Sequence, residues 1–190
     1  MIITRAELAD LPRLAQFRTD AAAWLAQAGS DQWSTDFPSD HIARSIQAGE
    51  VFVVRESAGA DELAATITLD AETDPLLWTA AEREVAAMYV HKLTVDRAYA
   101  GQELGTRLLD WAGDRAARRG AKLLRLDAWT SNRRLHQYYV ERGFQHVRTV
   151  LDPEVGGSGW VAQRKAVVAD HGFDDWTIQG GGELVGTSDR

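Results

Sequence analysis

Apolar residues near the N-terminus recur at steps of three and four positions, which is the spacing of one face of a helix. This spacing predicts a helix over 11–28 that ends at Gly29, and a shorter helix over 39–47. A β-rich run at 2–4 predicts an opening strand. The strongest helical pattern covers 104–119, where apolar and charged residues take opposite faces.

Strand-like runs separate and follow these helices. β-Branched, aromatic and alternating apolar residues predict strands over 51–55, 63–69, 86–95, 122–129, 144–150 and 160–168. Ser131 is expected to cap one more helix, which ends at Gly143. Residues 70–84 are expected to form a polar connecting segment. The resulting order, β-α-α-β-β-β-α-β-α-β-β, predicts a single mixed α/β domain over 1–168.

Residues 169–190 differ in composition from the predicted domain. This segment carries five acidic residues, one arginine and three successive glycines. Two interpretations remain open. The composition favours a flexible acidic tail, whereas Phe173, Trp176 and Ile178 could instead pack on a partner subunit and form a homodimer.

The overall composition excludes several classes of protein. Hydrophobic residues make up 45% and charged residues 26% of the 190 positions, as in an ordinary globular domain. No apolar run reaches the roughly 20 residues that span a bilayer, and the N-terminus shows no signal-peptide pattern. We therefore expect a cytoplasmic protein without a membrane partner. The net charge of -7 lowers the expectation of a nucleic-acid partner.

Cysteine and the common catalytic motifs are absent. The lack of cysteine excludes disulfides, a cysteine–zinc site and a cysteine nucleophile. The sequence contains neither GxSxG nor GxxxxGK[ST], and its five histidines lack the HxH and HExxH spacings. We expect no bound metal, and neither a hydrolase nor a P-loop enzyme.

The segment over 89–109 combines features that suit an anionic ligand. A predicted strand leads through a glycine-bearing loop into a helix that opens near Leu104. Backbone N–H groups at a helix start lack intrahelical partners, and the helix dipole adds partial positive charge there. Gly101 permits a tight turn and Gly105 permits close approach of the backbone, so the loop could hold a diphosphate.

This loop resembles motif A of the GNAT superfamily of acyl-CoA-dependent N-acyltransferases, which reads Q/R-x-x-G-x-G/A. The aligned residues here are 100–105, AGQELG, with Ala100 and Glu103 departing from the pattern. Downstream, Asn132, Tyr139, Gly143 and Phe144 match the family segment N-x6-Y-x3-G-F, and the resemblance extends over about 1–168. Four arginines near the two helix starts could offset the charge of Glu103: Arg97, Arg107, Arg133 and Arg134.

The resemblance implies a GNAT-like fold, with a mixed central sheet and flanking helices, that acts as an acetyl-CoA-dependent N-acetyltransferase. In this family the thioester lies in a gap between the two central strands, and the amine attacks it directly. Tyr139 matches the tyrosine that acts as general acid toward the sulfur, with Tyr138 as the alternative. The residues implied to bind acetyl-CoA are Leu93, Thr94, Val95, Ala100, Gly101, Gln102, Glu103, Leu104, Gly105, Thr106 and Asn132.

His91 is the candidate general base, because the two-residue strand period puts it on one face with Tyr89, Leu93 and Val95. The ordinary pKa of histidine lies near neutrality, which suits that role. Glu84 is the alternative base. Trp33, Tyr89 and Trp129 are expected in the acceptor pocket, and three further residues are plausible linings: Gln32, His41 and Trp78.

Two functions remain open at this stage. One is acetyl transfer to the amine of a small molecule or to a protein amino group. The other is a non-catalytic acyl-CoA-binding or interaction module on the same fold, which the departures at Ala100 and Glu103 would suit. The retained Tyr139, at the family spacing, favours the enzyme.

Overall fold

An eight-stranded sheet in the order β6-β7-β5-β4-β3-β2-β1-β8 forms the centre of the computed structural model, which describes residues 1–27, 29–33 and 39–177. β4 with β5 and β1 with β8 are parallel, and the other neighbours are antiparallel. The strands are β1 (Ile2–Arg5), β2 (Val51–Arg55), β3 (Ala65–Asp70), β4 (Ala87–Val95), β5 (Leu123–Ala128), β6 (Gln145–Thr149), β7 (Trp160–Lys165) and β8 (Asp174–Asp175).

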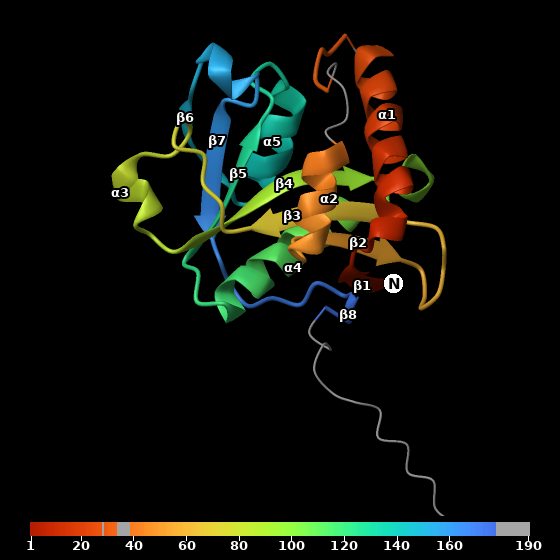
Figure 1. Cartoon of the computed structure of the whole chain (residues 1–190). Helices are drawn as coiled ribbons and strands as arrows, with labels where there is room; N and C mark the ends of the chain where they lie inside the picture. Colours follow the sequence, from red (N-terminus) through yellow and green to blue (C-terminus); the bar gives the residue numbers. More distant parts are fainter. Residues whose placement is uncertain (28, 34–38, 178–190) are drawn as a thin grey trace, which may run out of the picture.

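Helices cover both faces of this sheet (Figure 1). The α-helices are α1 (Leu11–Gln27), α2 (Ser39–Gln47), α3 (Ala80–Arg83), α4 (Leu104–Arg118) and α5 (Arg133–Glu141). α1 and α2 pack on one face through a cluster that includes Phe17, Ile42 and Val53. α4 and α5 pack on the other face. The predicted mixed α/β fold in a single domain is confirmed.

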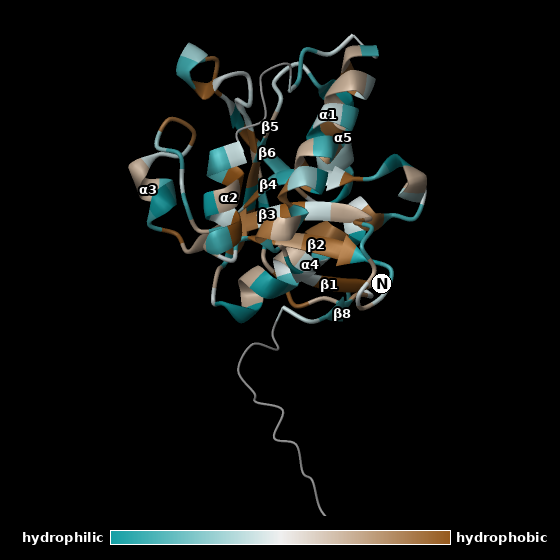
Figure 2. Cartoon of the chain, turned by 45° about the vertical axis from the view of Figure 1, so that its right-hand side comes forward, coloured by the Kyte–Doolittle hydropathy of each residue, from teal (hydrophilic) through white to brown (hydrophobic). Residues whose placement is uncertain are grey.

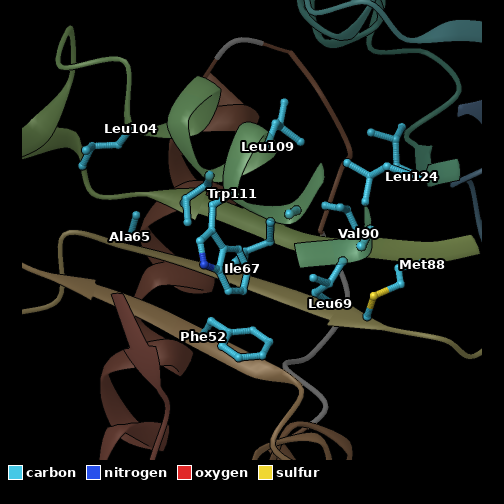
Figure 3. Packing of buried hydrophobic residues seen from close by; sticks show 14 of the residues in the cluster. Phe52, Ala65, Ile67, Leu69, Met88, Val90, Leu104, Leu109, Trp111 and Leu124 are labelled. Atoms are coloured by element: carbon cyan, nitrogen blue, oxygen red, sulfur yellow. The ribbon is translucent and has the colours of Figure 1, made fainter. Parts of the chain in front are cut away.

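The larger core lies between the sheet and α4. Trp111 of α4 is fully buried and its ring centroid lies 4.7 Å from that of Phe52 on β2. Figure 3 shows these rings among aliphatic side chains of β3 and β4, including Ile67 and Val90. Figure 2 shows the brown, apolar strands enclosed by helices with hydrophilic outer faces. Burial of each large side chain contributes about 1.5–3 kcal/mol.

A β-bulge interrupts β4. His91 pairs with Thr68 and Thr94 pairs with Thr66. These two pairs are three residues apart on β4 but only two residues apart on β3. The extra residue is accommodated at Lys92, whose φ of 51° is left-handed. The side chains of β4 that pack on the α4 side are Met88, Val90, Leu93 and Val95.

Because of the bulge, the expectation that Tyr89, His91, Leu93 and Val95 share one face of the strand is wrong. Tyr89 packs in a separate cluster with Trp78, on the sheet face opposite the one that Leu93 and Val95 take. His91 follows Tyr89 onto that face, where it approaches carboxylates of β3 and β5. Because the bulge inserts one residue, the two-residue period fails between His91 and Leu93.

Two local expectations also change. Asn132, and not Ser131, is the N-cap of α5, since its side chain accepts a hydrogen bond from the Leu135 N–H. The segment over 70–84, expected to be a polar connection, contains the short helix α3. Thr79 is the N-cap of this helix and forms a capping box. A helix of four residues has too few turns to produce a recognisable period.

Residues 169–177, which were expected to be part of the tail, pack on the fold. β8 pairs with β1, and Phe173 is 7% exposed. Trp111 donates to Asp175 over 2.8 Å, and Arg107 donates to the Gly172 carbonyl. Phe173 therefore contributes to this chain's own core, while Trp176 is 44% exposed. The rest of that segment, Ile178 included, lies outside the described residues.

Candidate active site

A cavity of about 1020 Å³ opens where β4 and β5 separate. The ladder between the two strands ends at Val90 and Leu126. Beyond that pair, His91–Val95 of β4 and the end of β5 line the cavity. α1 contributes to one side of it, and the loop before α4 together with α5 contributes to the other. The backbone of β4 in this stretch has no ladder partner on β5.

The loop before α4 forms one end of the cavity. Ala100, Gly101 and 103–106 line it, whereas Gln102 does not. Glu103 is the N-cap of α4 and takes left-handed angles, with φ 54° and ψ 21°. This conformation explains why the family motif has glycine there, because a side chain in this region is strained. Glu103 takes this left-handed conformation although it is not a glycine.

Tyr138 and Arg142 of the α5 region complete this end. A Cβ at Gly105 would overlap the Tyr138 hydroxyl, so a side chain at this position would have to displace that hydroxyl. The Arg142 guanidinium lies 3.5 Å from the centre of the Tyr138 ring and donates to the Thr106 hydroxyl over 2.8 Å. Sequence reasoning missed Arg142 because its place beside the loop depends on how α5 packs against α4.

The arginines proposed from sequence are differently placed. Arg107 donates to the carbonyls of His171 and Gly172 and so holds the C-terminal segment. Arg97 lines the cavity, stacked over Trp24. Arg133 and Arg134 do not line it. Arg142 is the arginine that contacts the loop directly, through the Thr106 hydroxyl.

Tyr139 of α5 is one of the residues that line the cavity. It is 7% exposed, stacks with Trp160 and meets Phe144 edge-on. Burial raises the pKa of its hydroxyl far above the ordinary value, so it is protonated at neutral pH. No hydrogen bond to this hydroxyl occurs within the part of the chain that the structure describes. The hydroxyl can therefore donate to a ligand.

Asn132 links the two ends of the cavity. Its Oδ1 accepts from the Leu135 N–H, and its Nδ2 donates to Oε1 of Gln32 over 2.8 Å. Gln32 follows α1 and lines the cavity as well. Asn132 therefore both caps α5 and ties it to the segment after α1.

His91 lies between two carboxylates at the other end of the cavity. Its Nε2 is 3.5 Å from Asp70 Oδ1, and its Nδ1 is 3.5 Å from Asp127 Oδ1. Burial lowers the pKa of His91, but the interactions with Asp127 and Asp70 outweigh it and raise the pKa to about 9. His91 is thus an imidazolium at neutral pH, in contrast to the neutral base expected from sequence.

Sequence reasoning missed both carboxylates. Asp70 and Asp127 each follow a run of alternating apolar residues at the end of a strand, in TITLD and LRLD. A carboxylate at a position that continues a strand is the signal that was available. Asp127 lines the cavity directly.

The predicted acceptor residues divide into two groups. Trp33 and Trp129 line the cavity, and the Trp129 indole donates to Asp31 over 2.7 Å. Tyr89 does not line it, because its hydroxyl accepts from Arg125 over 2.8 Å in a buried cluster. Glu84, the alternative base, ends α3 on the surface.

Two further residues that were expected to line the acceptor pocket also lie outside the cavity: Trp78 and His41. Trp78 is 2% exposed and meets the Tyr89 ring edge-on. Within residues 1–27, 29–33 and 39–177, no group of three or more potential ligand side chains could hold a metal ion. No helix in those ranges combines the length and apolar character that a membrane crossing demands.

Comparisons with known proteins agree with this geometry. The model of the acetyltransferase (GNAT) family matches residues 18–144. The uncharacterized N-acetyltransferase YesJ of Bacillus subtilis is 35% identical over 130 residues, which are 65% of this chain and 70% of YesJ.

Solved structures show the same fold. A GNAT-family acetyltransferase from Listeria monocytogenes superposes with a TM-score of 0.71 at 27% identity, covering 86% of this chain and 94% of the other. The PaiA N-acetyltransferase of Thermoplasma acidophilum, solved in complex with coenzyme A, gives 0.62 at 18% identity, with 86% and 97% covered. The family model spans more than half of the chain, and the resemblance drawn from the two motifs is confirmed: the chain belongs to the GNAT family of acetyltransferases.

Proposed function

We propose that the protein transfers an acetyl group from acetyl-CoA directly to an amine. The observation that carries this proposal is the large cavity at the gap between β4 and β5. It joins a loop suited to a diphosphate, a buried tyrosine hydroxyl and a carboxylate-flanked histidine. An amine acceptor and a thioester donor could meet there without a covalent enzyme intermediate.

The residues at the loop fit acetyl-CoA. The start of α4 offers backbone N–H groups and the positive end of the helix dipole to a diphosphate. Arg142 adds a positive charge beside Thr106 and Gly105. The Thermoplasma relative in complex with coenzyme A and a Mycobacterium tuberculosis structure of the same fold that contains CoA support this assignment.

Acetyl-CoA supplies the activated thioester, and the chain's own groups handle charge and protons around it. Backbone N–H groups of Leu93–Val95 are the candidates to stabilise negative charge on the carbonyl oxygen. Tyr139 holds its proton at neutral pH and donates it from the hydroxyl to the departing sulfur. Its place in the lining of the cavity supports that role.

His91 and Asp127 form the proton-accepting end. The two carboxylates around His91 leave the cluster with one net negative charge when the imidazole is protonated, which attracts an ammonium group. The neutral imidazole, formed as pH approaches 9, accepts the proton that the amine must lose.

Release of free thiol from acetyl-CoA, measured across a panel of amines, tests the proposal. Tyr139→Phe should lower kcat by about 10²–10⁴-fold with little change in acetyl-CoA affinity, because only proton donation is lost. Tyr89→Phe is the matched control, since it also removes a buried tyrosine hydroxyl but lies outside the cavity.

The control should keep its turnover once corrected for the folded fraction. If the wild-type protein binds acetyl-CoA yet releases no thiol with any amine, the non-catalytic binding module is the better interpretation. Equal turnover in Tyr139→Phe and wild type would remove Tyr139 as the acid and return attention to Tyr138.

A further inference from the structure

A second, smaller cavity of about 30 Å³ opens beside the main one. The two share five lining residues: Phe17, Arg18, Trp33, Lys92 and Thr94. The smaller cavity lies between α1, α2 and the central strands, on the same side of the sheet as His91. It is therefore an extension of the acceptor end and not of the loop that suits coenzyme A.

The polar lining of this cavity suits an anion. It consists of two cations, Arg18 and Lys92, and three threonines, 66, 68 and 94. The remaining lining is apolar, and no carboxylate among the described residues belongs to it. Asp70 and Asp127, the acidic groups nearby, are instead placed around His91.

The bulge in β4 directs Lys92 to this place. Lys92 follows His91 with a left-handed φ, and both side chains line the main cavity. Lys92 is half-buried, yet within the described ranges no carboxylate oxygen lies within 4.0 Å of its ammonium. Asp127 and Asp70 act on this ammonium only from beyond that distance. A half-buried cation without a counter-ion in contact is costly, so an anion that contacts it would be stabilised there.

The hydroxyl groups add directional donors. Thr68 is 4% exposed, and in the part of the chain that the structure describes its hydroxyl makes no hydrogen bond. It can therefore donate to a ligand in the small cavity. Thr66 already donates to the Phe52 carbonyl over 3.1 Å, and Thr94 donates to the Lys92 carbonyl over 3.3 Å.

The volume favours a carboxylate over a larger oxyanion. One water needs roughly 10–15 Å³ of such space, so about 30 Å³ accommodates about two oxygen atoms. We propose that the small cavity binds the carboxylate of the acceptor, and that the acceptor is an amino acid or similar amino carboxylate whose amine lies beside His91 and Asp127. This inference rests on the proposed function.

Matched pairs of acceptors test it with the full-length protein. Each amino carboxylate is compared with the amine that lacks only the carboxylate: L-leucine with isopentylamine, L-phenylalanine with phenethylamine and γ-aminobutyrate with propylamine. Phosphoethanolamine with ethanolamine tests the larger anion. Thiol release at saturating acetyl-CoA gives kcat and KM for each compound.

At least one amino carboxylate should exceed its partner amine by about 10- to 100-fold in kcat/KM, mostly through KM, because a charge-assisted hydrogen bond is lost with the carboxylate. Lys92→Met should abolish this ratio while sparing the partner amine, and Lys92→Arg should restore part of it. Thr68→Val should reduce the ratio more weakly, which provides a second variant if Lys92→Met does not fold. Lys165→Met is the control, since Lys165 is an exposed lysine outside both cavities.

Four results would overturn the inference: no amino carboxylate preferred over its partner amine, a ratio unchanged by Lys92→Met, a preference confined to phosphoethanolamine, or an equal loss of kcat on both members of each pair in Lys92→Met. The last would make Lys92 part of the proton transfer. A wild-type protein that releases no thiol with any amine would refute the proposed function. In that case, thermal stabilisation by the three amino carboxylates in the presence of coenzyme A still decides the inference: at least one of them should stabilise the wild-type protein, and Lys92→Met must abolish that stabilisation.

Discussion

His91 should lose its proton near pH 9 in the folded protein, far above the value of 6.5 for an ordinary histidine. A pKa raised on folding means that the protonated histidine stabilises the fold. That contribution is fully present below about pH 6.5 and is lost as the pH rises through 9. A shift from 6.5 to about 9 corresponds to about 3 kcal/mol of unfolding free energy.

Urea unfolding at a series of pH values from 6 to 10 measures this contribution. The wild-type protein should lose about 3 kcal/mol across the range, and His91→Gln, which cannot titrate there, should show a much flatter profile. Asp127→Asn should move the decline to lower pH, because it removes one of the two carboxylates that hold the proton. Identical pH profiles in wild type and His91→Gln would refute the reasoning.

The same ionisation should govern turnover if His91 is the base. Only about 1% of His91 is neutral at pH 7 when its pKa is about 9, so kcat should rise about tenfold per pH unit until pH 9. An arylamine acceptor, which is uncharged throughout this range, separates the enzyme's ionisation from that of the substrate. If the rise of kcat with pH ends near neutrality, or if it persists in His91→Gln, a group other than His91 accepts the proton from the amine.

Three further outcomes follow from the fold and the loop. Gly105→Ala should diminish the thermal stabilisation by acetyl-CoA, because the new Cβ overlaps the Tyr138 hydroxyl. The double variant with Tyr138→Phe should recover part of that stabilisation, and no recovery would contradict the contact. Glu103→Gly should raise the unfolding free energy by about 1 kcal/mol, because it relieves the strain of a left-handed side-chain residue, and it should also tighten acetyl-CoA binding. Glu103→Gln should change only the charge-dependent part of that binding. Phe173→Ala should lower the unfolding free energy by about 3 kcal/mol in a urea titration, and an unchanged midpoint would show that the C-terminal segment does not support the core.

Most of the fold could be predicted because its long elements have a strong period. The helix over 104–119 is observed as α4, with a boundary that differs by one residue, and the strand over 86–95 is observed as β4. β8 has only two residues and pairs through its backbone with β1, so no side-chain pattern indicates it. Phe173 looked like part of a tail because its partners lie far away along the chain.

The site was predictable where a local motif determines the structure. Tyr139 and the loop over 100–106, apart from Gln102, line the cavity, because each depends on short-range geometry that the sequence encodes. Tyr89 was misplaced, and the carboxylates around His91 were missed, because their positions depend on strand register. Register is a property of paired strands, so one strand read alone cannot supply it.

The bulge at Lys92 accounts for both the error and the arrangement of the site. A regular strand would alternate sides at every residue, so His91 and Lys92 could not both face the same side of the sheet. The inserted residue lets both line the cavity and then returns Leu93 to the α4 side, where it packs with the core. The same irregularity lies where the ladder between β4 and β5 ends. A single extra residue in β4 therefore lies beside the gap between β4 and β5 and also brings His91 and Lys92 together in the lining of the cavity.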